Sequence, residues 1–557
     1  MNQREISYTI RKRILTLGFF FLFIIIALIS RLFYIQIIKS EEYSKKAVQQ
    51  RLMSIPLGIE RGNIYDKNFI PFTGRNNKKY IIVYPRFIHD INTAISIISK
   101  AACLPEDVVE KKINSKAEAL EFIYNSDKEE YYNLIEKGKL KGVIAVEKKQ
   151  RYSEDSLCRH IIGYISKTDK KGEMGIEKSM DNYLDCGRNC DVIAVVDSSK
   201  NIIPGLGFRK VEIAGGSNNY NIKLTLDYHI QRIVENIIKE NNLDGAVVVM
   251  DVKNGNILAM VSHPDFDQNN VQKYINSSGE ELINKAVWPY DLGSVFKTVV
   301  AAAVIESKKI DLNQKYLCEG SISVGNSVIN CSTHKTHENR EIALDEAFAL
   351  SCNTTFVKIG TELGDEAILN MAKKLGLGEK QCYEILEEKS GYIPKPREEG
   401  IGNISIGQGK IQVTPLQVTA MMATIANNGI RYNPRLVDEL VDEEGNIVKI
   451  IEKSKPQIVM SPSSAYLLKD MLSKVTIYGT GKSANLDVLG GSSGKTGTAQ
   501  TGINYGKVIH GWFAGYVPSI DPKYAITVFI NDGKSGGVNA APIFREIAEE
   551  LLTKIKR

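Results

Sequence analysis

Apolar and polar residues are segregated most sharply near the N-terminus of the chain. An uncharged apolar run extends from Ile14 to Ser30 and resumes after Arg31 as far as Ile38. About 20–25 such residues can cross the hydrocarbon core of a bilayer as one helix. Bulky aromatic and β-branched residues follow the run, where a cleavable signal would carry small residues. The pattern therefore favours an uncleaved membrane anchor over residues 14–38, rather than a signal peptide or a buried core helix.

The residues before the apolar run are basic. Four positive charges precede it, at Arg4, Arg11, Lys12 and Arg13. Positive flanks stay on the cytoplasmic side of a membrane. We therefore expect a cytoplasmic tail over residues 1–13 and an extracytoplasmic location for everything after residue 40. A second apolar stretch of spanning length is not found in the sequence, which indicates a single-pass protein of the cell membrane.

Residues 39–235 combine short strand-like segments with charged helical ones. Hydrophobic alternation and glycine pairs between residues 191 and 227 indicate β-structure. Nothing in this part of the chain has the pattern of a reaction centre. We interpret it as a mainly β pedestal or dimerisation domain that holds partner proteins.

The pattern changes near residue 236, where the second domain (236–557) is expected. An amphipathic helix (228–241) leads into a β-branched run, Gly245–Asp251, that is typical of a buried strand. Asn254–Gly255 predicts a hairpin turn, with Ile257–Ser262 as the partner strand. Further helices and strands are expected at 298–306, 344–350, 416–427, 511–517, 524–531 and 541–555. Strand pairs at both ends with helices between them indicate an α+β or mixed α/β fold whose sheet is covered by helices.

Composition narrows the function only a little. The chain has 557 residues, is 43% hydrophobic and 24% charged, and carries a formal net charge of +6. So small an excess of positive charge, without a basic run, gives little support to nucleic-acid binding. It is compatible with work beside anionic lipids or an anionic wall.

Three short motifs carry the candidate chemistry, in the order Ser294-Val-Phe-Lys297, Ser351-Cys-Asn353 and Lys495-Thr-Gly-Thr498. Each is weak alone, and S-x-x-K occurs again at Ser492-x-x-Lys495. On a helix, Ser294 and Lys297 share a face. A neutral lysine there can act as the base that a serine nucleophile requires. Burial and repulsion from a second cation, such as Lys495, would lower the pKa of that lysine.

The other two motifs suit substrate binding. The Ser351 hydroxyl can relay a proton, and the Asn353 amide can both donate to and accept from a substrate amide. Residues 495–498 follow a glycine-rich turn and precede a strand, so an edge strand could pair with an extended peptide. Gly497 permits close approach, and Thr496, Thr498 and Lys495 suit a terminal carboxylate.

Together these motifs resemble those of class B penicillin-binding proteins, which are serine-type D-alanyl-D-alanine transpeptidases. Leu292 stands where proline is usual in the family. The resemblance covers nearly the whole chain, and its other blocks are Arg61–Asp66, His160–Gly163, Gly175–Glu177, Leu224–Asp227, Asn284–Ala286, Ser405–Gly409 and Val413–Gln417.

The resemblance implies a β-lactamase-like transpeptidase domain with a central antiparallel sheet, working without a metal or cofactor. It implies that Ser294 is acylated, with Lys297 as general base. Ser351 and Lys495 would transfer the proton, and Asn353 would position the substrate. Thr496, Gly497 and Thr498 would bind substrate, and the backbone N–H groups of Ser294 and Thr498 would form the oxyanion hole. Expected ligands are peptidoglycan stem peptides and β-lactams, and expected partners are membrane proteins of the wall-synthesis machinery. The process served stays open between division, elongation and spore-cortex synthesis.

Parts of the sequence are compatible with other kinds of site. Gly490-x-Ser492-x-Gly494 matches a nucleophile elbow, which requires a helix directly after the serine. Cys318, Cys331, His334 and His337 form an acceptable zinc set, but an extracytoplasmic location favours disulfides, such as Cys318–Cys331 across a predicted hairpin or Cys186–Cys190. A catalytically idle β-lactam sensor or scaffold is the non-enzymatic alternative.

Cysteine pairing is not fixed by the sequence. Cys352 lies inside the Ser-x-Asn motif. A disulfide between Cys352 and either Cys318 or Cys331 would pull Asn353 out of position. The alternative is that Cys352 packs inward as a small buried hydrophobe.

Overall fold

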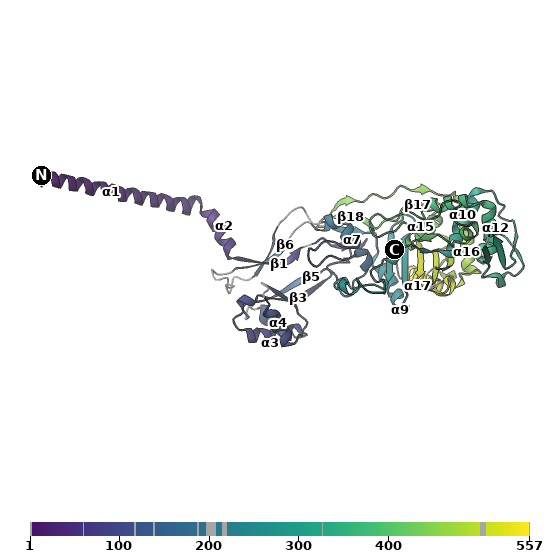
Figure 1. Ribbon diagram of the computed structural model, residues 1–557, viewed down its shortest axis with the longest axis horizontal. Coiled ribbons are helices and arrows are strands. Elements are labelled where there is room, and N and C mark those ends of the chain that lie inside the picture. Colours follow the sequence, from purple (N-terminus) through teal and green to yellow (C-terminus); the bar gives the residue numbers. More distant parts are fainter. Residues whose placement is uncertain are drawn as a thin grey trace. The chain divides into compact units, whose positions relative to one another are not determined.

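The computed structural model describes residues 3–59, 61–115, 119–136, 140–185, 189–195, 208–213, 220–325, 327–501 and 508–555. The chain forms two compact units, each built from separate segments (Figure 1). The smaller unit comprises Met1–Glu60, Asn77–Lys148 and Gly187–Gly215. The larger unit comprises Arg61–Asn76, Lys149–Cys186 and Gly216–Arg557.

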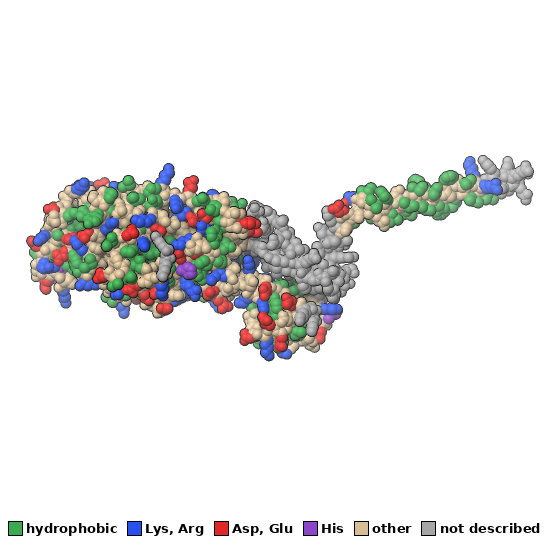
Figure 2. All heavy atoms as spheres, turned by 180° about the vertical axis from the view of Figure 1, so that it is seen from behind, with side chains coloured by type: hydrophobic (Ala, Val, Ile, Leu, Met, Phe, Trp, Pro, Cys, Tyr) green, Lys and Arg blue, Asp and Glu red, His purple; other side chains and the backbone are tan. Residues whose placement is uncertain are grey.

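The smaller unit begins with the long apolar helix that the sequence predicts. Helix α1 (Gln3–Phe33) continues through a π-helical turn, Tyr34–Ile38, and α2 (Ser40–Arg51) follows. The stretch Ile10–Ile38 has a mean hydropathy of 2.5, and its most apolar part is not buried against the rest of the protein. Figure 2 shows apolar side chains along this helix. Among the described residues it is the one helix long and apolar enough to cross a membrane.

Two small sheets complete this unit. Strands β1 (Leu52–Ile59), β6 (Asn189–Val195) and β7 (Phe208–Ile213) form one in that order. The second has the order β4-β3-β5 and packs with three helices around one apolar core. Its elements are β3 (Asn76–Val83), α3 (Ile91–Ala102), α4 (Glu106–Ile113), β4 (Leu120–Ile123), α5 (Glu129–Glu136) and β5 (Val143–Gln150). The β-structure predicted between residues 191 and 227 is confirmed on β6, β7 and β8 (Asn221–Leu224), whereas Cys186 lies outside the described residues.

A five-stranded antiparallel sheet organises the larger unit, in the order β10-β9-β23-β22-β21. Its strands are β9 (Gly245–Asp251), β10 (Ile257–His263), β21 (Ser493–Gln500), β22 (Ile509–Val517) and β23 (Tyr524–Ile530). The predicted hairpin around Asn254–Gly255 is confirmed by the antiparallel pairing of β9 with β10. Strand β21 lies at the end of the sheet.

Alternation along the strands divides the apolar side chains between the two faces of the sheet. Val247 and Val249 of β9 pack with α9 (Tyr228–Glu240) and the C-terminal helix α17 (Ala541–Lys554). Ala246 and Val248 belong instead to a much larger cluster that includes α10 (Lys297–Ser307) and α15 (Pro415–Ala426). Helices therefore cover both faces, as the sequence indicates.

Smaller elements surround this sheet. The helices are α6 (Arg159–Ile162), α7 (Gly175–Ser179), α8 (Asp181–Leu184), α11 (Leu344–Ala349), α12 (Asn353–Leu363), α13 (Asp365–Lys374), α14 (Ile401–Ile406) and α16 (Pro462–Ile477). A second sheet has the order β19-β18-β8-β2, with β2 (Ile64–Tyr65), β18 (Val437–Val441) and β19 (Ile447–Ile450). The hairpin predicted between Cys318 and Cys331 is formed by β13 (Ser321–Val324) and β14 (Ser327–Asn330).

The boundary expected between residues 235 and 236 falls inside α9, so the compact units are not divided there. Val234 and Ile237, on either side of that point, are buried in the same core. Segments much earlier in the chain also belong to the larger unit, because β2 pairs in parallel with β8.

A buried ion network fastens two of these early segments to each other. The carboxylate of Glu177 is fully buried and accepts from Arg61 Nε at 2.6 Å and from Arg151 Nε at 2.7 Å. The Tyr152 hydroxyl donates to the same carboxylate at 3.0 Å, and Arg61 also pairs with Asp181. Removing one member of such a network leaves buried charge without a counter-ion.

We predict that Glu177→Ala lowers the free energy of unfolding of the larger unit by about 3–5 kcal/mol, because two guanidinium groups lose their shared partner. Calorimetry or denaturant titration would measure the loss. The matched control is Glu173→Ala, which removes an exposed carboxylate nearby and should cost less than about 0.5 kcal/mol. Equal stability of the two variants would contradict the assignment.

Candidate active site

Ser294 lies at the junction between the sheet and helix α10. The sequence predicts a helix starting at Ser294, but the structure has a 3₁₀ turn over Gly293–Phe296 before α10 begins at Lys297. Gly293 has φ of +60°, a conformation that glycine adopts without strain. A Cβ at this position would lie 2.5 Å from the carbonyl oxygen of Thr498. Glycine thus permits the turn that carries Ser294 to press against strand β21.

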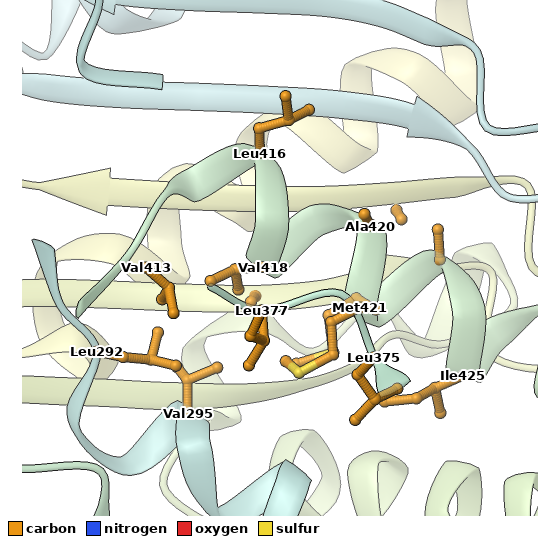
Figure 3. Packing of buried hydrophobic residues seen from close by; sticks show 14 of the residues in the cluster. Leu292, Val295, Leu375, Leu377, Val413, Leu416, Val418, Ala420, Met421 and Ile425 are labelled. Carbon is orange, nitrogen blue, oxygen red and sulfur yellow. The ribbon is translucent and has the colours of Figure 1, made fainter. Parts of the chain in front are cut away.

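Two of the other sequence blocks hold this turn. The Gly293 N–H donates to the carbonyl of Gly407, the left-handed residue that ends α14, at 2.9 Å. Thr414 caps α15 in a capping box with Gln417, and Pro415 occupies the first helical turn. Leu292 and Val295 flank Ser294 and belong to the same buried cluster as α15 (Figure 3). The nucleophile candidate is therefore mounted on a packed core.

Lys297 is fully buried and points to the Ser-x-Asn motif. Its Nζ donates to the carbonyl oxygen of Ser351 at 2.7 Å, to Ser351 Oγ at 3.2 Å and to Asn353 Oδ1 at 2.7 Å. Within the described chain its Nζ has no hydrogen bond to the Ser294 hydroxyl, which lies one helical turn away.

Lys495 approaches the same hydroxyl from strand β21. Its Nζ, also fully buried, donates to Ser351 Oγ at 3.1 Å and to the carbonyl of Thr496 at 3.1 Å. One serine oxygen therefore bridges two lysines that are distant in sequence. Ser351 itself has φ of +57°, an uncommon conformation for a residue with a side chain.

Burial shifts the proton affinity of both lysines. Desolvation lowers the pKa of Lys297 to about 8. Desolvation, followed by repulsion from Lys297, lowers the pKa of Lys495 well below its usual value. Repulsion between the two cations thus lowers the pKa of Lys495, whereas the sequence suggests that Lys495 lowers the pKa of Lys297; burial is the larger cause for Lys495 and the cause of the lowered pKa of Lys297. A lysine near neutral pKa can accept a proton from a hydroxyl.

Strand β21 presents the Lys-Thr-Gly-Thr motif at the end of the sheet. Lys495–Thr498 pairs in antiparallel register with Gly511–Ala514 of β22. A Cβ at Gly497 would lie 2.8 Å from the carbonyl oxygen of Leu292, so this glycine also permits close approach. Thr496 is buried, whereas Thr498 is exposed.

Asn353 starts α12 directly after the Ser351 turn. Its Nδ2 donates to the carbonyl oxygen of Asn330 at 2.8 Å, while its Oδ1 accepts from Lys297. The three motifs are thus joined by hydrogen bonds that run from Asn353 through Lys297 and Ser351 to Lys495.

Sequence reasoning missed several supporting residues. Thr480 Oγ1 lies 2.7 Å from Thr496 Oγ1 and shares a hydrogen bond with it. The sequence signal for Thr480 is the pair of glycines that flank it, Gly479 and Gly481. Gly407 was noticed only as part of a family block. Asn330 acts through its backbone carbonyl, for which the sequence holds no signal.

The nucleophile-elbow interpretation of Ser492 does not fit this geometry. Ser492 is buried, and its hydroxyl donates to the carbonyl of Ala484 at 2.5 Å. Strand β21 follows it instead of the helix that an elbow requires.

Comparison with protein families agrees with the motifs. Residues 245–549 match the penicillin-binding protein transpeptidase domain, which is more than half of the chain. Residues 57–215 match the penicillin-binding protein dimerisation domain.

Individual relatives extend the match over nearly the full length. Stage V sporulation protein D of Bacillus subtilis is 28% identical, over 99% of this chain and 87% of the relative. Peptidoglycan D,D-transpeptidase FtsI of Escherichia coli is 26% identical, over 94% of this chain and 89% of the relative.

A solved structure described as "Structural coordination of polymerization and crosslinking by a peptidoglycan synthase complex" shares the fold. It has a TM-score of 0.70 at 23% identity and covers 98% of this chain and 99% of its own. The transpeptidase match, the dimerisation match and the joined motifs lead to one conclusion: the chain belongs to the penicillin-binding protein transpeptidase family, as a class B peptidoglycan D,D-transpeptidase that binds penicillin and cross-links peptidoglycan.

Proposed function

We propose that Ser294 carries the acyl group of this transpeptidase. Its oxygen attacks the penultimate D-Ala carbonyl of a stem peptide, the amide C–N bond breaks, and D-Ala leaves with a proton. An amine of a second stem peptide then attacks the ester and releases Ser294. The observation that carries the assignment is the hydrogen-bonded path from Lys297 through Ser351 to Lys495, beside the turn that holds Ser294.

Lys297 is the general base in this proposal. It follows Ser294 by one helical turn, is fully buried, and has a pKa lowered to about 8. Ser351 and Lys495 then return the proton to the leaving amine. The short path matters because the proton moves between groups already in hydrogen-bond contact, without entry of bulk water.

The backbone N–H groups of Ser294 and Thr498 form the oxyanion hole in this proposal. The close approach of Gly293 to the Thr498 carbonyl supports this assignment. Gly293 directly precedes Ser294, so the Ser294 turn and strand β21 meet at this point. A well-placed donor of this kind contributes about 3–4 kcal/mol to the transition state.

Substrate binding is assigned to the Lys-Thr-Gly-Thr strand and Asn353. An extended stem peptide can add to the sheet beside β21, the end strand, through main-chain hydrogen bonds. Thr496, Gly497 and Thr498 would line its path, and the Asn353 amide would fix a substrate amide.

The anchor is proposed to lie with its N-terminus in the cytoplasm. The basic residues Arg11, Lys12 and Arg13 lie at the N-terminal end of the apolar stretch Ile10–Ile38. Positive flanks favour the cytoplasmic side of a membrane. The larger unit and the part of the smaller unit after residue 40 would then lie outside the cell membrane, where peptidoglycan is assembled.

Partner membrane proteins of the wall-synthesis machinery are proposed to bind the smaller unit. It matches a dimerisation domain over much of its length and contributes none of the motif residues. The cellular process is left among division, elongation and spore-cortex synthesis, because relatives named for sporulation and for D,D-transpeptidation both match nearly the full chain.

The assigned roles make a first prediction. The wild-type enzyme should react with fluorescent penicillin and release D-Ala from a stem peptide, and Ser294→Ala should do neither. Lys297→Arg keeps the charge but cannot become neutral, so acylation should fall by about 100-fold or more. Time courses of penicillin labelling, quenched at set intervals, would measure the acylation rates. Near-normal labelling by Lys297→Arg would remove the base assignment, and labelling without D-Ala release would favour a sensor.

A second prediction concerns pH. Lys297 works only in its neutral form, so the acylation rate should rise about tenfold per pH unit below 8 and level off above about 9. The sign follows from the lowered pKa: falling pH protonates the base. The slow residual reaction of Lys297→Arg is the control and should lack this profile. A flat wild-type rate between about pH 6 and 9 would contradict the role.

A third prediction separates the two units. The chain leaves the larger unit at Asn76 and re-enters at Lys149, and the Gly74 N–H donates to the Arg151 carbonyl at 3.0 Å. Residues 77–148 can therefore be replaced by a short Gly-Ser linker. This variant should still react with penicillin but fail to support growth or sporulation in a strain that lacks the native protein. Full complementation would refute the partner-binding role of residues 77–148, and Ser294→Ala in the full chain is the activity-dead control.

A further inference from the structure

Four metal-ligating side chains that the transpeptidase reaction does not use converge beside the Ser-x-Asn motif. They are Cys318, Cys331, His337 and Cys352, and their ligand atoms all lie within 4.8 Å of one another. All four residues are buried, with exposures of 0%, 7%, 1% and 0% in that order. They come from separate segments: the residue after β12 (Tyr316–Leu317), the residue after the β13–β14 hairpin, the residue after the 3₁₀ turn His334–Thr336, and the N-cap of α12.

The spacing of these atoms fits a tetrahedral centre. Cys331 Sγ lies 3.8 Å from Cys352 Sγ and 3.8 Å from His337 Nε2. Two sulfurs bound to one zinc ion at about 2.3 Å in a tetrahedron are themselves ~3.8 Å apart. A disulfide would require the same sulfurs to approach to about 2.05 Å. The observed separation is therefore too long for a disulfide and matches that expected of two thiolates around a common ion.

The imidazole of His337 is oriented for such an ion. The Thr336 hydroxyl donates to the carbonyl of Thr333 at 2.7 Å, so its oxygen can accept from His337 Nδ1 at 3.0 Å. This tautomer places the proton on Nδ1 and leaves the lone pair of Nε2 directed toward Cys331. Histidine ligands of zinc are commonly fixed by a partner of this kind on the other ring nitrogen.

We propose that Cys318, Cys331, His337 and Cys352 bind one Zn²⁺ ion as a closed structural site. Three thiolates and one neutral imidazole form an accepted tetrahedral zinc set, with no position left for water or substrate. The proposal reverses the sequence-based expectation of no metal. It also changes the ligand set considered there, because Cys352 takes the place of His334.

His334 remains the matched neighbour of this site. Its Nδ1 lies 3.4 Å from Cys318 Sγ, but it is not one of the four residues whose ligand atoms all lie within 4.8 Å of one another, and it is only partly buried. His337, in contrast, is buried and contacts Cys331. The chain thus offers two histidines three residues apart, of which one is assigned as a ligand.

The ion would fasten the hairpin segment to the catalytic motif. Cys352 lies between Ser351 and Asn353, and the Asn353 amide already donates to Asn330, the residue before Cys331. A shared metal ion would add a second link between the hairpin segment and the Ser-x-Asn motif. Its effect on acylation rests on the proposed roles of Ser351 and Asn353, whereas metal binding itself does not.

The test uses the full-length protein purified in detergent without chelator or added metal. We expect elemental analysis to find one zinc per chain, and Co²⁺ exchanged into the site to give the intense visible bands and thiolate charge-transfer bands of a tetrahedral cobalt centre. His337→Ala should lose the metal. His334→Ala and Cys382→Ser, which alters a buried cysteine outside the group, should keep it.

Two results would overturn the site. One is a chain without bound metal, whether mass spectrometry finds a Cys331–Cys352 disulfide or free thiols. The other is loss of metal from His334→Ala with retention in His337→Ala. Should His337→Ala fail to fold, chelation of the wild-type protein and reloading with Zn²⁺ gives the same readout.

Penicillin labelling tests the positioning role separately. Removal of the ion should slow acylation by on the order of 100-fold, the scale expected when a catalytic group moves by about 1 Å, and Zn²⁺ should restore it. Unchanged labelling of the metal-free chain would overturn the positioning role but not the site. Inactivity of the zinc-loaded wild-type chain would instead count against the proposed function.

Discussion

Two buried lysines share one serine hydroxyl, and much of the larger unit serves to keep them there. An ammonium group out of water is costly unless it gives up its proton or gains partners. Lys297 and Lys495 come from a helix and a strand, and both donate to Ser351 Oγ. Without the packed cluster behind α10 and α15, water would reach these groups and return their pKa values toward 10.5. The apolar core therefore sets the chemistry of the site as well as its shape.

Close backbone approach is the second requirement of the site. Gly293 and Gly497 lie where the nucleophile turn and strand β21 meet, and any side chain there would overlap a carbonyl oxygen. The contact brings Ser294 beside the strand on which a peptide can lie. Repulsion between atoms, rather than attraction, thus explains why positions 293 and 497 are glycine.

The sequence predicts much of this arrangement, where the signal is local. Strands such as Gly245–Asp251 and Tyr524–Ile530 are apolar runs. Helix α15 begins with a capping-box sequence, which is also a local signal. Each motif could also be placed on or beside a predicted helix or strand, because its residues are close together in the sequence. The 3₁₀ turn at Ser294 was not foreseen, since it depends on the contact of Gly293 with Thr498.

Non-local contacts account for the other differences. Arg61 joins the larger unit through Glu177, far along the chain, and no periodicity in either segment indicates this pairing. The cysteine group is another example. Cys331 and Cys352 are far apart in the sequence, and only the folded chain brings their sulfurs to 3.8 Å and places His337, rather than His334, in the group.

The parallel pairing of β2 with β8 and the antiparallel pairing of β8 with β18 have a consequence for biosynthesis. Ile64 is made early, yet the sheet that receives it is complete only after Ile450, the last residue of β19, has been made. Contacts of such large sequence separation form late, because a long loop must close first. The early segments of the larger unit must therefore wait, unfolded, while most of the chain is synthesised. A chain cut short before β18 would leave those segments without their sheet and open to proteolysis and aggregation. The larger unit can in this sense be completed only late in synthesis, because its earliest segment belongs to a sheet whose other strands are made much later.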